Sequence, residues 1–150
     1  MRGFKPQEVA NTAWAFATAG VSSPPLFAAI AAEAEKQMRG FNPQSLANTA
    51  WAFATAGVSS PTLFKAIAAE AEKQVRRFSP QGLSITAWGF AALGVVAPAL
   101  FKVIVSMLPS LMKESSASDR SQIIIFNFAL VIILKVSMIV DSAPTKPKNY

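Results

Sequence analysis

The sequence repeats itself with a period of 37 residues, and this period restricts the fold more than any other feature of the chain. Residues 4–40 and 41–77 are identical at 30 of 37 positions, and residues 41–77 and 78–114 are identical at 16. The residues in register are Phe4, Phe41 and Phe78, Pro6, Pro43 and Pro80, Gln7, Gln44 and Gln81, Trp14, Trp51 and Trp88, Gly20, Gly57 and Gly94, and Phe27, Phe64 and Phe101. Such a period is typical of proteins in which each unit covers its apolar surface with the next unit.

The second unit contains start and stop signals for two helices. Asn42 is a good N-cap residue with a proline after it, and Gly57 follows the last apolar residue, so a helix is expected over 43–56. Ser60, also followed by a proline, repeats the start signal, and a second helix is expected over 61–76. We therefore predict an all-α fold, an α-solenoid of antiparallel helix pairs.

Three such units fill residues 1–114, at 4–40, 41–77 and 78–114. The third unit is degenerate in its second half, where Pro109 falls within the expected second helix. A proline in a helix interior costs about 3 kcal/mol or forces the helix to end early, and both outcomes are open for this helix.

The two ends of the chain depart from the repeat. Residues 1–4 are identical to residues 38–41, so the chain is expected to begin inside a unit and to be a piece of a longer array. Residues 115–140 are interpreted as a degenerate fourth repeat, as a hydrophobic capping helix, or as non-native sequence. A membrane segment at 123–140 is an alternative, although an asparagine and a lysine leave it short of the roughly 20 apolar residues that a span needs. Residues 141–150 are predicted to be a disordered tail.

The composition argues against most catalytic chemistry. The chain has no His and no Cys, so it lacks an imidazole base, a thiolate nucleophile and the usual zinc ligands. Only eight residues are acidic, and four of them recur at the same two repeat positions. We therefore predict a protein that is not an enzyme and that needs no metal and no cofactor. A net charge of +6 favours a polyanionic partner but does not identify one.

Helical phase divides the first helix of the second unit into two faces. The face predicted to be core contains Leu46, Ala47, Ala50, Trp51, Phe53 and Ala54. The opposite face is polar but uncharged and contains Gln44, Ser45, Asn48, Thr49, Ala52 and Thr55. On the second helix, oppositely charged residues three and four positions apart, Glu70 with Lys73 and Glu72 with Arg76, are predicted to form solvated surface pairs.

Residues 41–57, FNPQSLANTAWAFATAG, resemble the first-helix signature F-x-P-Q-x-L-A-N-x-L-W-A-L-A-x-L-G of octotricopeptide (heptatricopeptide) repeats, found in RAP-associated and FAST-kinase-like proteins. The resemblance extends over residues 1 to about 112. It implies a right-handed superhelix that binds single-stranded RNA, with other RNA-processing proteins as further partners. It also implies a role in RNA processing, stability or translation in a chloroplast or mitochondrion. No segment of this chain resembles a RAP domain.

The polar face of the first helix in each unit is the expected ligand surface, because such helices usually line the inner side of a helix-pair array. The candidate RNA-binding residues on this face are Glu8, Asn11, Thr12, Ser45, Asn48, Thr49, Gly82 and Thr86. Among them, the positions that vary between units, Glu8, Ser45 and Gly82, are the candidates for base specificity. The candidate phosphate ligands are Lys36, Arg39, Lys73, Arg76 and Arg77. The small residues on the same ridge, Ala15, Ala52 and Gly89, are expected to let a base approach closely.

Structural roles are the alternatives for several of these positions. Asn11 and Asn48 could form a hydrogen-bond ladder between helices, and the glutamine after each helix-starting proline could satisfy helix end groups. The three tryptophans are expected at the edge of the core, in packing rather than in base stacking. The cations could belong to a solvated outer face. The competing functions are a protein-binding scaffold and a fragment attached to a membrane through residues 123–140.

Overall fold

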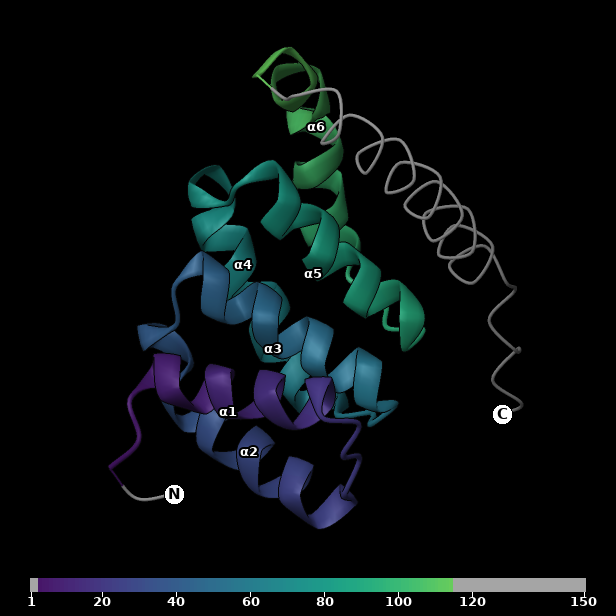
Figure 1. The fold of residues 1–150 in the computed structure, drawn as a ribbon. Helices are drawn as coiled ribbons and strands as arrows, with labels where there is room; N and C mark the ends of the chain where they lie inside the picture. Colours follow the sequence, from purple (N-terminus) through teal and green to yellow (C-terminus); the bar gives the residue numbers. More distant parts are fainter. Residues whose placement is uncertain (1–2, 115–150) are drawn as a thin grey trace, which may run out of the picture.

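The computed structural model describes residues 3–114, which form six α-helices and two short 3-10 turns and contain no β-strand (Figure 1). The elements are α1 (Pro6–Thr18), α2 (Pro24–Gln37), η1 (Met38–Gly40), α3 (Pro43–Ala56), α4 (Pro61–Gln74), η2 (Val75–Arg77), α5 (Pro80–Ala92) and α6 (Pro98–Glu114). Each α-helix begins at a proline, and the expected all-α architecture is present in this part of the chain. The interpretations of residues 115–140 and 141–150 fall outside the described residues.

The ends of α3 follow the signals expected from the sequence. The Asn42 side chain accepts a hydrogen bond from the Ser45 backbone N–H at 2.8 Å, which satisfies one of the unpaired donors at the helix start. At the other end Gly57 adopts the left-handed conformation with φ +68°, and its N–H donates to the carbonyl of Ala54. A residue with a side chain rarely adopts this φ, which is why glycine ends the helix.

The second helix of the same unit differs in detail from its prediction. The regular α-helix α4 ends at Gln74, and η2 continues as a 3-10 turn where the α-helix was expected to reach residue 76. The Ser60 side chain forms no capping hydrogen bond, although its carbonyl accepts from the Phe64 N–H at 3.0 Å. Ser60 therefore precedes the helix without capping it through its hydroxyl group.

The helices form two layers, with α1, α3 and α5 in one layer and α2, α4 and α6 in the other (Figure 1). We call these the A layer and the B layer. Neighbouring A-layer helices pack directly along one another, whereas the B-layer helices are more loosely spaced. The A layer is therefore the tighter side of the stack.

A column of five phenylalanines forms the centre of the core between the two layers. Phe27, Phe53, Phe64, Phe90 and Phe101 are all fully buried, and they come alternately from the B layer and the A layer. Successive ring centroids lie 5.0, 6.5, 4.9 and 6.0 Å apart, with steeply inclined ring planes. Edge-to-face contacts of this kind add about 0.5–1.5 kcal/mol each beyond area burial. The column joins each unit to the next one.

Small side chains allow the A-layer helices to approach closely. A Cβ atom on Gly89 of α5 would lie 2.8 Å from the carbonyl oxygen of Ala50 in α3, so the two backbones are in contact there. Ala52, at the position of α3 that corresponds to Gly89, is fully buried. These small residues were expected to admit a base, but they admit the neighbouring helix instead.

A glutamine near the end of each of the first two B-layer helices ties that helix to the start of its own unit. The Gln74 amide nitrogen donates to the Phe41 carbonyl at 2.7 Å and to the Glu70 carboxylate at 2.8 Å. Gln37 donates in the same way to the Phe4 carbonyl, at 2.8 Å. The predicted pair of Glu70 and Lys73 is formed at 3.5 Å, but Glu70 is only 9% exposed, so its carboxylate is not solvated as expected.

Of the two outcomes expected for the last helix, the early end does not occur. The α6 helix runs from Pro98 to Glu114 and contains Pro109 in its interior. Pro109 is exposed, and Val105, four residues earlier, is 37% exposed. Water can therefore reach the carbonyl group that proline leaves without its helical donor, which lowers the cost of an interior proline.

Candidate nucleic-acid interface

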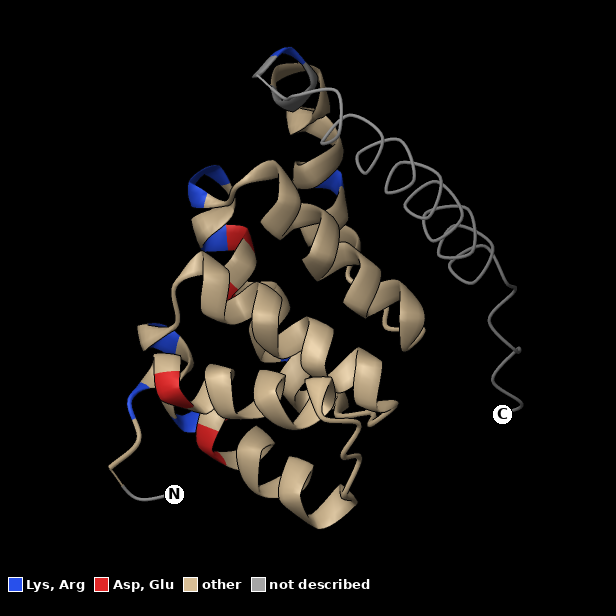
Figure 2. Cartoon of the chain, viewed as in Figure 1, with Lys and Arg blue, Asp and Glu red and all other residues tan. Residues whose placement is uncertain are grey.

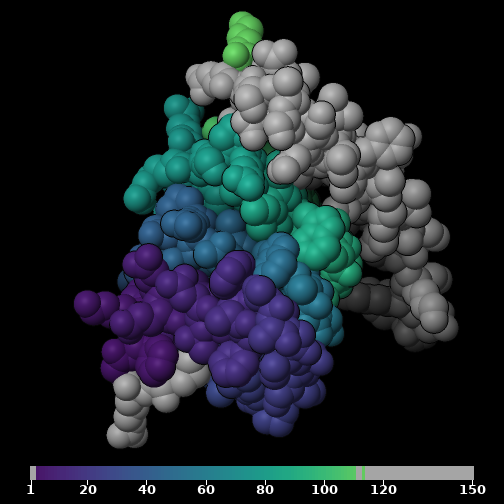
Figure 3. Space-filling model, viewed as in Figure 1, coloured from purple at the N-terminus to yellow at the C-terminus, as the bar shows by residue number. Residues whose placement is uncertain are grey.

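One ridge of each A-layer helix faces away from the B layer and is not covered by a neighbouring helix. The ridge follows the spacing i, i+4, i+7, i+11. Its residues are Gln7, Asn11, Trp14 and Thr18 on α1, Gln44, Asn48, Trp51 and Thr55 on α3, and Gln81, Ile85, Trp88 and Ala92 on α5, and all of them are exposed or half-buried. We call these residues together the outer ridge. In the space-filling view of Figure 3, α1, α3 and α5 lie next to one another on the side that faces the viewer.

The tryptophans lie on this outer ridge. Trp14 and Trp88 are 46% and 45% exposed, so nearly half of each side chain is open to solvent. Trp51 is half-buried and packs against the core cluster, and its ring centroid lies 6.3 Å from that of Trp14 with the planes inclined by 34°. The face thus exposes large aromatic surfaces, and the three helices that form it carry one charged residue, Glu8 in the first turn of α1.

Two grooves cross the outer face, one at each contact between A-layer helices. The groove between α1 and α3 has a volume of about 570 Å³ and is lined by Asn11, Trp14, Ala15, Gln44 and Asn48. The groove between α3 and α5 also has a volume of about 570 Å³ and is lined by Asn42, Pro43, Gln44, Ala47, Asn48, Arg77, Phe78, Ser79, Gln81, Gly82 and Ile85. Gln44 and Asn48 line both grooves, so a ligand that follows the face passes these two amides.

The amides of the outer ridge are available to a ligand. Within residues 3–114, the hydrogen-bond ladder considered for Asn11 and Asn48 is not formed. The starts of α3 and α5 are capped by Asn42 and Ser79, so the glutamines are not needed as caps there. A primary amide offers two donors and an acceptor, which suits the edge of a nucleobase.

Several candidate residues lie inside the A layer and not on its outer face. Ser45, Thr49 and Thr86 are 3%, 0% and 0% exposed. The hydroxyl groups of Thr49 and Thr86 donate to the carbonyls four residues earlier at 2.8 Å, so their hydrogen bonds are satisfied within their own helices. In the closed stack these three side chains are not accessible to a ligand.

The corresponding residues of the first unit are in contact with solvent. Glu8 is exposed and its carboxylate accepts from the Lys5 backbone N–H at 2.8 Å, while Thr12 is half-buried and its hydroxyl donates to the Glu8 carbonyl. Gly82, in the third unit, is half-buried and lines the second groove. Three positions that vary between the units were the candidates for base specificity. Two of them, Glu8 and Gly82, are accessible to a ligand, whereas Ser45 is buried.

The positive charges lie around the outer ridge and not on it. The helices α1, α3 and α5 contain no Lys or Arg, as Figure 2 shows. Arg77, in the turn before α5, lines the second groove, and Arg39 and Arg76 are exposed in the turns at the same edge of the A layer.

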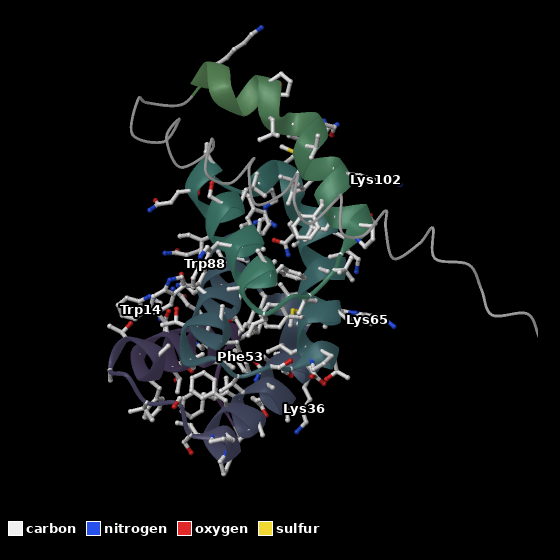
Figure 4. The ribbon with its side chains drawn as sticks, turned by 90° about the vertical axis from the view of Figure 1, so that its right-hand side faces the viewer. Trp14, Lys36, Phe53, Lys65, Trp88 and Lys102 are labelled. Atoms are coloured by element: carbon white, nitrogen blue, oxygen red, sulfur yellow. The ribbon has the colours of Figure 1, made fainter. Side chains whose placement is uncertain are left out.

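The two candidate lysines lie on the B-layer helices. Lys36 pairs with Glu33 at 3.8 Å and Lys73 with Glu70 at 3.5 Å. Lys36 lies on the opposite side of the molecule from Trp14 and Trp88 (Figure 4). The candidate cations are therefore divided, and Arg77 lines the groove between α3 and α5.

Neither a metal site nor a membrane span is evident among residues 3–114. No group of three or more acidic, His or Cys side chains in this part could hold a metal ion. No helix in the same part is both long and apolar enough to cross a bilayer. The segment 123–140, considered as a membrane segment, lies outside the described residues.

Comparison with protein families gives one match. A family model described as a protein of unknown function, DUF1601, matches residues 1–12, 23–49 and 60–84. Each of the two longer segments contains one B-layer helix, the turn after it and the start of the next A-layer helix. No curated protein and no solved structure matches the chain.

Proposed function

We propose that this chain binds single-stranded RNA along the outer face of the A layer. In this proposal the helix pairs are 37-residue repeats of an α-solenoid that continues as a right-handed superhelix. The observation that carries the proposal is the position of Gln44 and Asn48, whose amides line two successive grooves on one face of the A layer. Single strands expose the hydrogen-bonding edges of their bases, and helical-repeat proteins contact such edges with a few side chains per repeat.

The packing of the two layers favours the A layer as the inner side of the array. Neighbouring helices touch in the A layer and are more loosely spaced in the B layer. A longer stack of such pairs would therefore curve around the A layer. A single strand following that side would meet each outer ridge in turn.

The tryptophans supply a second type of contact in this proposal. Trp14 and Trp88 are nearly half exposed on the same ridge as the amides. Stacking of a base on an aromatic side chain contributes about 1–3 kcal/mol and tolerates any base. We therefore assign affinity to the tryptophans and base discrimination to the amides.

The phosphates are assigned to the edge of the A layer where its helices begin. Arg77 reaches the second groove from this edge, and Arg39 and Arg76 lie in the turns nearby. The N-terminal ends of helices also carry partial positive charge. In this arrangement the bases of the RNA lie on the outer ridge, where the amides are, and its phosphates lie along the edge, where the arginines are.

The resemblance to octotricopeptide repeats supports a place for this binding in RNA processing, stability or translation in a chloroplast or mitochondrion. Other RNA-processing proteins are the partners that it implies. Expression of a tagged chain from its own gene, followed by fractionation and sequencing of crosslinked RNA, would test this. Recovery of transcripts from neither organelle would contradict the assignment.

The binding proposal is tested by fluorescence anisotropy with a labelled single-stranded RNA of random sequence and with the corresponding duplex. We expect saturable binding to the single strand that is at least tenfold tighter than to the duplex. The double substitution Gln44→Ala and Asn48→Ala should weaken it about tenfold or more, as expected when hydrogen bonds to bases are lost. Lys65→Ala is the control, because Lys65 lies on the opposite side from the tryptophans (Figure 4). Absence of binding to any single strand, or equal losses in both variants, would contradict the proposal.

A further inference from the structure

The outward side of α1, away from α3, exposes positions that are buried in the other two A-layer units. Phe4 is 40% exposed, whereas Phe41 and Phe78 at the equivalent positions are 2% and 6% exposed. Phe16 is 36% exposed, whereas Phe53 and Phe90 are fully buried. The same side chains are therefore covered wherever another helix pair precedes them in the stack.

The small and polar positions of this side show the same difference. Ala15 is exposed, whereas Ala52 is fully buried and Gly89 lies against the backbone of α3. Thr12 is half-buried, whereas its equivalent Thr49 is fully buried. The helix that covers Gly89 is α3, the preceding helix of the A layer.

A half-formed groove lies on this side of α1. It has a volume of about 550 Å³ and is lined by Gly3, Phe4, Glu8, Asn11 and Thr12. Gly3, Phe4, Glu8 and Asn11 are equivalent, two repeats later, to Arg77, Phe78, Gly82 and Ile85. Those four residues line the α5 side of the groove between α3 and α5. The other side of that complete groove comes from the start of α3. The missing half is therefore the start of one more A-layer helix.

We propose that the outward side of α1 is an inter-repeat interface whose occupant is another helix pair of this repeat type, placed before α1 as α1 and α2 are placed before α3. The chemistry of the occupant follows from the contacts already present. Its first helix needs small residues like Ala10, Ala13 and Ala17, which are buried on α1. Its second helix needs an aromatic ring like Phe27, whose centroid lies 5.0 Å from that of Phe53, to cover Phe16. This inference does not depend on RNA binding.

A duplication that keeps the register provides the test. Residues 4–40 are inserted a second time between Gly3 and Phe4 of the full chain, which places the turn sequence MRG before each copy because residues 1–3 and 38–40 are identical. Each added repeat interface stabilises a solenoid, so the melting temperature should rise by several degrees. The backbone amides of the original α1 should also exchange more slowly.

The matched variant is Ala15→Arg, made both in the original chain and at the original α1 of the extended chain. In the original chain Ala15 is exposed, so the melting temperature should change by no more than about 2 °C. In the extended chain the arginine would occupy the position that is fully buried as Ala52 in α3, so the gain from the duplication should be lost. Equal melting temperatures of the original and extended chains would overturn the proposal. An equal effect of the arginine in both chains would overturn it as well.

Discussion

The substitution Gly89→Ala measures how closely α3 and α5 approach, because it sets two effects of opposite sign against each other. Alanine favours a helix over glycine by about 1 kcal/mol. The added Cβ, however, would lie 2.8 Å from the carbonyl oxygen of Ala50 and 2.9 Å from its carbonyl carbon, where ordinary contact begins at 3.4 Å. The atoms that it meets belong to the backbone of α3, so no side-chain rotation relieves the contact.

We expect the steric cost of the added methyl group to be slightly larger than the gain in helix propensity. Added methyl groups in close-packed regions cost about 1–3 kcal/mol. At the equivalent position the α1–α3 contact holds an alanine, Ala52. We therefore expect α3 and α5 to move slightly apart when Gly89 becomes alanine, which relieves part of the steric cost. We therefore expect a net loss of about 1 kcal/mol in the free energy of unfolding, or a melting temperature lower by about 2–4 °C.

Urea unfolding followed by circular dichroism provides the measurement. Gly82→Ala is the control in the same helix, because its nearest neighbour is a side-chain atom, the Ser79 hydroxyl oxygen at 3.2 Å, which needs to shift by only a few tenths of an ångström. The control should leave stability unchanged or raise it by up to about 1 kcal/mol. If Gly89→Ala also stabilised the protein by about 1 kcal/mol, helix propensity alone would explain it, and the close backbone contact would be refuted.

Three further substitutions test other contacts by the same unfolding measurement. Gln74→Ala should cost about 1–3 kcal/mol, because the buried Phe41 carbonyl and the Glu70 carboxylate both lose a donor; a loss below about 0.5 kcal/mol would show that water replaces the amide. Asn42→Ala should cost about 1 kcal/mol through loss of the α3 cap, and Asn42→Asp should cost little; equal losses in both would contradict a capping role. Phe53→Leu should cost about 1–3 kcal/mol, because two edge-to-face contacts are lost with little change in volume; an unchanged stability would show that the column contributes packing only.

The local elements of the fold could be predicted from the sequence because their signals are local. A cap residue, a proline and a glycine placed α3 over the residues where it is found. Ser60 shows the limit of such signals, because a residue type that often caps a helix does not do so here. Pro109 shows a second limit, because its cost depends on whether water reaches the carbonyl group that it leaves unpaired.

The candidate site was predictable only as a broad face. Helical phase separates the apolar from the polar side of α3. It does not show that a neighbouring helix of the A layer covers part of the polar side. Ser45 and Thr49 lie under that helix, whereas Asn48 lies outside it. The small residues Ala52 and Gly89 were the available signal, since small side chains mark places where helix backbones approach. The exposure of Trp14 and Trp88 depends on the same arrangement and could not be inferred from their types.

The most direct test of RNA binding on the outer ridge uses the tryptophans as reporters. The chain has three tryptophans, and all of them lie on this ridge. Unlabelled single-stranded RNA is titrated into the full chain while tryptophan emission is recorded, with the matching duplex as the control. The proposal predicts saturable quenching by the single strand, at the concentrations at which anisotropy detects binding, and little quenching by the duplex. Binding seen by anisotropy without any change in tryptophan emission would place the RNA elsewhere and contradict the proposed interface.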